Sequence, residues 1–278
     1  MMTCSTIQTE MQTIKNDEYS NATQGRKAWW LVWLCLVGLA VSVMALPARA
    51  EGLAMGGTRL IFNGAEESAS ISVSNTSDKD VWLMRFWVSP YGGEAAASTM
   101  AKTSAKKEQK AALPFVVTPP LWRLDPQSEV QLRVNQVADT LPQDRESVFH
   151  LNALAIPPKK GGKEYEKGVQ SGLQFAINTQ IKLIYRPKAL NQRAVIKALP
   201  SKVTVKHQGN HVVVNNPTPY YITLVQIEVD KQAVQTDQDT MLAPFGSLSL
   251  PTSLSHGQFS YQTIDDDGAR TPVMSAYF

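Results

Sequence analysis

Short stretches in which apolar and polar residues alternate dominate the chain after residue 50. The clearest are 68–74 (SASISVS), 130–134 (VQLRV) and 222–229 (ITLVQIEV). Turn signals such as Gly209-Asn210 and the run 216–219 (NPTP) separate stretches of this kind about every 8–12 residues. A period of two places successive side chains on opposite faces of a strand. No stretch shows helical periodicity over three turns, so the sequence predicts an all-β fold of sandwiches or barrels.

The length of the chain predicts two domains. It has 278 residues, and a domain usually takes about 100–150. The segment 186–190 (RPKAL) joins them, because Pro187 ends a strand and stiffens the joint. We therefore expect the first domain at 51–187 and the second at 191–278. Residues 81–88 (VWLMRFWV) are apolar almost throughout, which predicts a strand covered on both faces.

The first fifty residues have the features of an export signal. Residues 28–46 carry no charge and follow directly on Arg26 and Lys27, and 48–50 (ARA) has the small residues that a signal peptidase requires. We expect cleavage after Ala50. The apolar run of nineteen residues also approaches the length of a membrane span, so an uncleaved anchor stays open as the alternative. The polar N-terminal extension has three possible starts: Met1, Met2 and Met11.

Composition argues against several functional classes. A net charge of +3, spread evenly, is too weak to indicate nucleic-acid binding. Cys4 and Cys35 both precede the predicted cleavage site, so the predicted mature chain has no cysteine. The chain also has no G-x-S-x-G motif and no Gly-rich phosphate loop. His207 and His211 have the spacing of zinc ligands on a helix, but Gly209-Asn210 between them predicts a turn. We expect no enzymatic activity, no cofactor and no metal site.

Several segments combine into a family signature. In chain order they are 57–62 (GTRLIF), 115–121 (FVVTPPL), 141–149 (LPQDRESVF), 181–187 (IKLIYRP), 215–221 (NNPTPYY) and 261–268 (YQTIDDDG). This ordered set, spread over 51–278, resembles the periplasmic chaperones of the chaperone–usher pathway, which build pili and fimbriae. The resemblance implies two immunoglobulin-like β-sandwich domains in an L or boomerang arrangement, preceded by a signal peptide. It also implies a location in the periplasm.

The same resemblance implies the partners. Pilin or fimbrial subunits lack their last strand, and the chaperone binds, folds and caps them by donor-strand complementation, a form of β-strand addition. An outer-membrane usher then receives the complex. Without a client, the exposed edge strand is capped or self-associates, since such edges otherwise invite aggregation. The alternative is an exported immunoglobulin-like structural or adhesive protein that folds no client, because a fold alone does not fix a function.

The segment 173–179 (LQFAINT) carries the most informative pattern. Leu173, Phe175 and Ile177 alternate along one face of a strand. The pattern alone favours the interpretation that these side chains line the core of their own domain. The resemblance implies instead that this is the donor strand, whose apolar side chains fill successive pockets of the subunit.

Two groups of charged residues match positions of the family signature. Without the resemblance, Arg59 would be interpreted as a solvated charge at a strand end, and Lys182 as an edge lysine that extends its ammonium group to water. The resemblance implies that they bind the C-terminal carboxylate of the subunit, which accepts charge-assisted hydrogen bonds. For Glu146, Arg186 and Asp266 it implies an interdomain salt bridge that fixes the angle between domains. Otherwise they are unrelated surface charges, whose pairs contribute about 0–1 kcal/mol.

Overall fold

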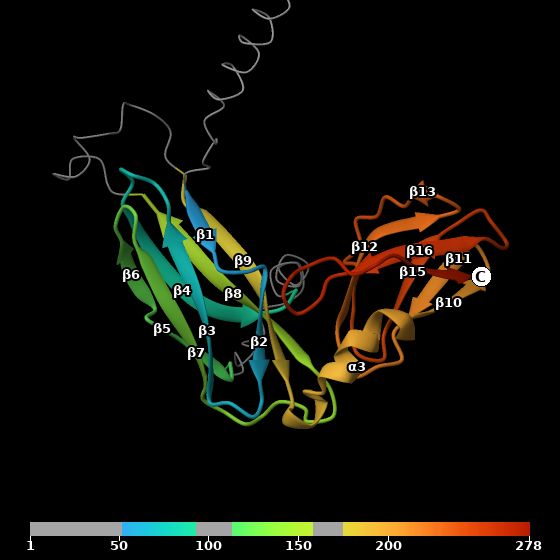
Figure 1. Cartoon of the computed structure of the whole chain (residues 1–278), viewed down its shortest axis with the longest axis horizontal. Coiled ribbons are helices and arrows are strands. Elements are labelled where there is room, and N and C mark those ends of the chain that lie inside the picture. Colours follow the sequence, from blue (N-terminus) through green and yellow to red (C-terminus); the bar gives the residue numbers. More distant parts are fainter. Residues whose placement is uncertain (1–51, 93–112, 158–174) are drawn as a thin grey trace, which may run out of the picture. The chain divides into compact units, whose positions relative to one another are not determined.

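The structure, a computed structural model, describes residues 52–92, 113–157 and 175–278 (Figure 1). The predicted export signal and Leu173 lie outside these residues. Strands dominate the described chain, and its one α-helix is short: α3 (Arg193–Ala198), flanked by the 3-10 turns η1 (Lys188–Leu190) and η2 (Leu199–Lys202). No described helix is long and apolar enough to cross a membrane. The all-β prediction is confirmed, with two sandwich domains.

The strands of the first sandwich lie in two sheets. One sheet has the order β1 (Leu53–Met55), β3 (Ser68–Asn75), β7 (Glu129–Gln136) and β5 (Phe115–Thr118). The other has the order β2 (Arg59–Asn63), β9 (Ile177–Arg186), β8 (Ser147–Ile156), β4 (Trp82–Pro90) and β6 (Leu121–Leu124). β2 runs parallel to β9, whereas the other neighbours are antiparallel.

The core of this sandwich follows the alternation in the sequence. In β7, Val130, Leu132 and Val134 are buried, and the residues between them are exposed. Phe62 and Leu183 from the facing sheet are completely buried in the same cluster. Two sheets whose inner faces interdigitate in this way stabilise each other by removing apolar surface from water.

Strand β4 differs from the prediction for residues 81–88. Met84, Phe86 and Val88 are buried in the core, but Leu83 is 48% exposed and Arg85 faces solvent. The expectation of a strand covered on both faces is therefore wrong. The outer face keeps its aromatic residue at the surface, where the Arg85 guanidinium lies 5.1 Å from the centre of the Trp87 ring. Such a cation–π contact allows an apolar side chain to remain on an uncovered face.

The second sandwich contains the remaining strands. One sheet has the order β10 (Thr204–Gln208), β11 (His211–Asn215) and β15 (Ser247–Pro251). The other has the order β13 (Gln232–Ala233), β12 (Ile222–Val229), β16 (Gln258–Thr263) and β17 (Met274–Tyr277), with β14 (Met241–Leu242) also paired to β12. Gly209, with φ of 60°, makes the predicted turn between β10 and β11. Val212, Leu224 and Phe259 are completely buried in a second hydrophobic core.

Candidate functional site: the free edge of β9 and the charged residues at its end

The two halves of β9 have different neighbours. β8 pairs with β9 along Ile177 to Tyr185, whereas β2 covers the opposite side only from Lys182 to Arg186. Within the described residues, the stretch 177–181 therefore has a paired strand on one side only. Its outward N–H and C=O groups form an open ladder that another strand can join.

The exposed half of β9 carries apolar side chains. Phe175, just before the strand, is 65% exposed, and Ile177 is 55% exposed. Further along the same face, Ile181, Leu183 and Tyr185 are buried in the first core. One alternating pattern thus serves two purposes, because its C-terminal part packs inside the domain and its N-terminal part does not. Leu173, the third predicted donor residue, lies outside the described part of the chain.

The structure brings Arg59 and Lys182 together. They are direct partners in the parallel pairing of β2 with β9, so their side chains project from the same face of the sheet. Burial is the main reason why the pKa of Lys182 is lowered, and the charge of Arg59 acts in the same direction. Burial also lowers the pKa of Arg59. The described residues contain no ion-pair partner for either cation, so two incompletely neutralised positive charges stand where the free edge of β9 ends.

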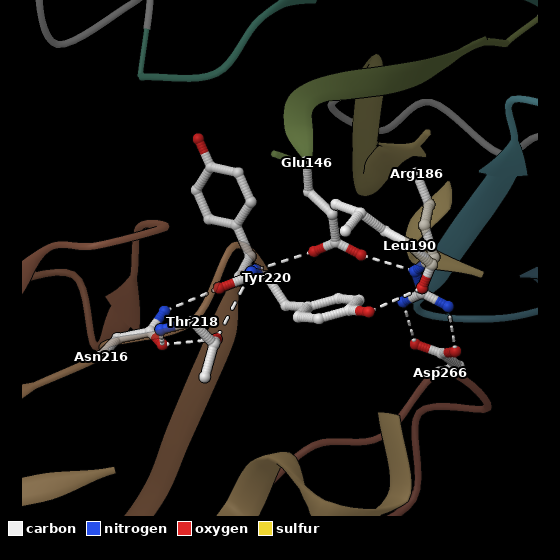
Figure 2. A network of polar contacts seen from close by, with 8 residues as sticks. Glu146, Arg186, Leu190, Asn216, Thr218, Tyr220 and Asp266 are labelled. Atoms are coloured by element: carbon white, nitrogen blue, oxygen red, sulfur yellow. Dashed lines mark hydrogen bonds and ion pairs between the residues drawn. The ribbon is translucent and has the colours of Figure 1, made fainter. Parts of the chain in front are cut away.

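Arg186, four residues further along β9, joins the two domains (Figure 2). Its Nε donates to Glu146 Oε1 over 2.6 Å, and its Nη1 and Nη2 donate to the two carboxylate oxygens of Asp266 over 2.6 and 2.8 Å. The side chains of Arg186 and Glu146 are only 4% and 1% exposed. Bidentate geometry of this kind suits a planar guanidinium and fixes its orientation.

Burial and pairing act in opposite directions on the pKa values of this network. Burial raises the pKa of Glu146, while the charge of Arg186 and the backbone N–H of Tyr221 counteract the increase. For Arg186, burial lowers the pKa, but the bonds to Asp266 and Glu146 outweigh it and the pKa is raised. The guanidinium therefore stays charged, and the network depends on all three side chains being present.

A turn in the second domain selects one of the three consecutive aspartates. Asp265 Oδ1 accepts from the backbone N–H groups of Asp267 and Ala269, over 3.1 and 2.8 Å, so this side chain is used within the turn. Asp266 points instead to Arg186 (Figure 2). Gly268, with φ of 85°, completes the turn in a conformation that favours glycine.

The segment 216–221 is part of the site, although no role was predicted for its individual residues. Asn216 Nδ2 donates to the carbonyl of Tyr220 over 2.6 Å, and its Oδ1 accepts from the Thr218 hydroxyl over 2.7 Å (Figure 2). The turn presents the backbone N–H of Tyr221 to Glu146 Oε2 at 2.7 Å. The run Asn-Pro-Thr-Pro signals such a side-chain-stabilised turn, but not the partner that it meets.

A cavity of about 490 Å³ lies beside this network. Arg59, Glu146, Arg186 and Asp266 line it, together with residues of α3. Among the described residues, no group of three or more His, Cys, Asp or Glu side chains is placed to hold a metal ion. The arrangement thus offers an open backbone edge, apolar side chains beside it and two cations at its end. These features suit an extended polypeptide that ends in a carboxylate.

Comparison with known proteins points to one family. A family model described as the N-terminal domain of PapD, a pili and flagellar-assembly chaperone, matches residues 52–191. The model for the C-terminal domain of the pili assembly chaperone PapD matches residues 198–274. Together the two models span most of the chain that the structure describes.

Individual relatives agree with these matches. The chaperone protein FimB/FhaD of Bordetella pertussis is 36% identical over 247 residues, which cover 86% of this chain and 94% of that protein. The probable fimbrial chaperone LpfB of Escherichia coli O157:H7 is 33% identical, with the same coverage. Among solved structures, the E. coli chaperone DraB has a TM-score of 0.62 at 31% identity, covering 82% of this chain and 99% of that one. The Salmonella enterica SafA pilin in complex with the SafB chaperone matches with a TM-score of 0.65 at 25% identity, covering 83% and 98%.

Proposed function

Because this chain belongs to the PapD family of pilus-assembly chaperones, we propose that it binds pilin-like subunits by lending them the free edge of β9. The observation that carries the proposal is the unpaired stretch 177–181 with Phe175 and Ile177 exposed beside it. A related chaperone, SafB, forms a complex with a pilin. Strand addition supplies backbone hydrogen bonds, while the alternate side chains supply specificity.

The positions of Arg59 and Lys182 determine the direction in which a subunit strand binds. We propose that these cations hold the subunit's terminal carboxylate. A strand that ends there and extends back along residues 181–175 must run parallel to β9. It then continues the line of β2, which begins at Arg59 and is also parallel to β9. The bound carboxylate sets the register, and a slip of one residue would turn every side chain to the wrong face.

Replacing Lys182 with alanine is expected to weaken subunit binding about tenfold to a hundredfold, because a hydrogen bond to a charged group contributes about 1.5–3 kcal/mol. Arg59→Ala is expected to act similarly. Both variants should remain folded, since neither cation has an ion-pair partner among the described residues and Arg59→Ala removes a single 3.3 Å hydrogen bond, from Nη1 to the carbonyl of Ile264. The measurement is pull-down of pilin-like subunits of the same organism after co-expression, followed by titration of the purified pair.

Lys188→Ala is the matched control, because Lys188 is exposed in η1 and lies beyond the end of β9. It should capture subunits as the unmodified chain does. Undiminished capture by both Lys182→Ala and Arg59→Ala would contradict the carboxylate-binding role. Loss of capture in the control as well would point to a general effect of removing positive charge.

We also propose that the Arg186 network fixes the angle between two domains, placed at 51–187 and 191–278. Both the Arg186 guanidinium and the Glu146 carboxylate are buried where the domains meet, and Glu146 also accepts from the backbone of the second domain. A fixed angle keeps the charged residues of the first domain in register with the client. An outer-membrane usher as the recipient, and self-association of the free chaperone, belong to the same proposal.

Export is the remaining part of the proposal, and the family is periplasmic. We expect the exported chain to begin at Glu51, because the A-x-A sequence ends at Ala50. Intact-mass measurement of the protein released from the periplasm tests the cleavage position. A membrane-bound protein that retains residues 28–46 would establish the uncleaved anchor instead.

A further inference from the structure

Tyr91 and Asp239 form a polar contact between the two domains that is separate from the Arg186 network. Tyr91 follows β4 in the first sandwich, and Asp239 precedes β14 in the second. The Tyr91 hydroxyl donates a hydrogen bond to Asp239 Oδ2. The other carboxylate oxygen, Oδ1, accepts from the backbone N–H of Met241 over 3.0 Å. Both oxygens of this exposed carboxylate are therefore held in place.

This contact lies beside Lys182. The Nζ atom of Lys182 is 5.8 Å from the centre of the Tyr91 ring, which also packs at 4.8 Å against the His150 ring. His150 and Lys182 are direct partners in the pairing of β8 with β9. The Tyr91 ring thus covers the part of the sheet from which Lys182 projects, and the Tyr91 hydroxyl holds a carboxylate above it.

Different acids act on the two cations of the carboxylate site. Asp266, Asp265 and Glu146 provide the negative charge that acts on Arg59. For Lys182, Asp239 is the acid whose charge raises the pKa, against the larger lowering caused by burial. Asp239 is not within ion-pair distance of Lys182, so it partly neutralises the ammonium group without blocking it.

We propose that Asp239, held by the Tyr91 hydroxyl, competes from within the chain for the positive charge that receives the subunit's terminal carboxylate. The inference rests on the proposed function, because it concerns the same site. An incoming carboxylate is attracted by Lys182 and Arg59 but repelled by the fixed charge of Asp239. The free chaperone thereby reduces the exposed positive charge of its empty site, and every ligand carboxylate must overcome this repulsion.

Asp239→Asn tests the inference, since it removes the charge and keeps the size and one acceptor oxygen. The probe is an N-acetylated hexapeptide of alternating valine and threonine with a free C-terminal carboxylate. The same peptide with a C-terminal amide is the reference. The measured quantity is the ratio of the two affinities, obtained by calorimetric titration at low salt. We expect Asp239→Asn to raise the ratio about twofold to fivefold, the range of a single exposed charge interaction. The gain should shrink at high salt.

Asp237→Asn is the matched control, because it makes the same charge change two residues away in the same exposed loop. It should leave the ratio unchanged. Tyr91→Phe keeps the ring over Lys182 but releases Asp239, so it should raise the ratio by less than Asp239→Asn does. An unchanged ratio in Asp239→Asn, or an equal gain in Asp237→Asn, overturns the inference. A lower ratio in Tyr91→Phe does so too, since Tyr91 would then donate to the ligand.

The proposed function can fail separately from this inference. If Lys182→Ala leaves the ratio of carboxylate to amide binding unchanged, the carboxylate site itself is wrong. If Lys182→Ala reduces the ratio to about one while Asp239→Asn has no effect, the site stands and only the competing role of Asp239 is lost.

Discussion

Replacing Arg186 with alanine is expected to lower the free energy of unfolding by about 3–5 kcal/mol, the usual effect of removing one partner from a buried ion pair. Glu146 is the reason, because its side chain is 1% exposed and, of its partners in the described part of the chain, would keep only the backbone N–H of Tyr221. Asp266 is 37% exposed, so water can replace its lost bonds. Urea unfolding of the purified protein, followed by tryptophan fluorescence, gives the measurement.

Arg145→Ala is the control, because it removes a different arginine, the one next to Glu146 in the sequence. Arg145 pairs with Asp144 over 2.7 Å, but both side chains are exposed to solvent, so its replacement should leave the unfolding midpoint nearly unchanged. The double variant Arg186→Met with Glu146→Leu should recover much of the lost stability, because it leaves no buried charge behind. Equal unfolding midpoints for Arg186→Ala and the unmodified chain would contradict a structural role for the network.

Replacing Phe175 and Ile177 together with serine is expected to weaken subunit binding about a hundredfold to ten-thousandfold. Each fully buried apolar side chain contributes about 1.5–3 kcal/mol, and each tenfold change in affinity corresponds to about 1.4 kcal/mol. Both side chains are more than half exposed in the free chain, so the stability of the chaperone should change by no more than about 0.5 kcal/mol. Titration with a purified subunit and urea unfolding measure the two effects separately.

Val116→Ser is the matched control for the double variant. Val116 is 49% exposed on β5, in the other sheet of the same sandwich, so Val116→Ser replaces an exposed apolar side chain with serine away from β9. Subunit binding should be unaffected. The donor-strand proposal is wrong if the double variant binds subunits normally, or if it unfolds and the control does not.

Periodicity and turn chemistry were sufficient to predict the all-β class, since alternation such as that of Val130, Leu132 and Val134 is a local property of the chain. The outer face of β4 was predicted wrongly because an apolar run does not reveal whether anything covers Leu83. The same limit applies to β9. Ile177 and Leu183 have the same parity in β9, but Ile177 is exposed and Leu183 is buried, and the pattern alone does not show that β2 pairs with β9 only from Lys182 onward.

The site was predictable only in part. The family resemblance selected Arg59, Lys182, Glu146, Arg186 and Asp266, and the structure places the last three in one network. The family resemblance gave no indication of Tyr91 and Asp239. These residues lie 148 positions apart and meet only through the packing of two domains. Contacts of this type have no local sequence signal, because neither residue belongs to a repeated pattern or a turn motif shared with the other.

The parallel pairing of β2 with β9 has a consequence for which polypeptides this chaperone can accept. β2 occupies the edge from Lys182 onward, so a strand added before it cannot stay paired with β9 beyond that residue. On the proposed mode of binding, a strand that ends at this point places its carboxylate beside Arg59 and Lys182, and an internal apolar stretch of an unfolded protein lacks that carboxylate and should bind more weakly. A dedicated assembly chaperone of this kind thus need not compete with general holding chaperones, because it selects its ligands by the position of their C-terminus.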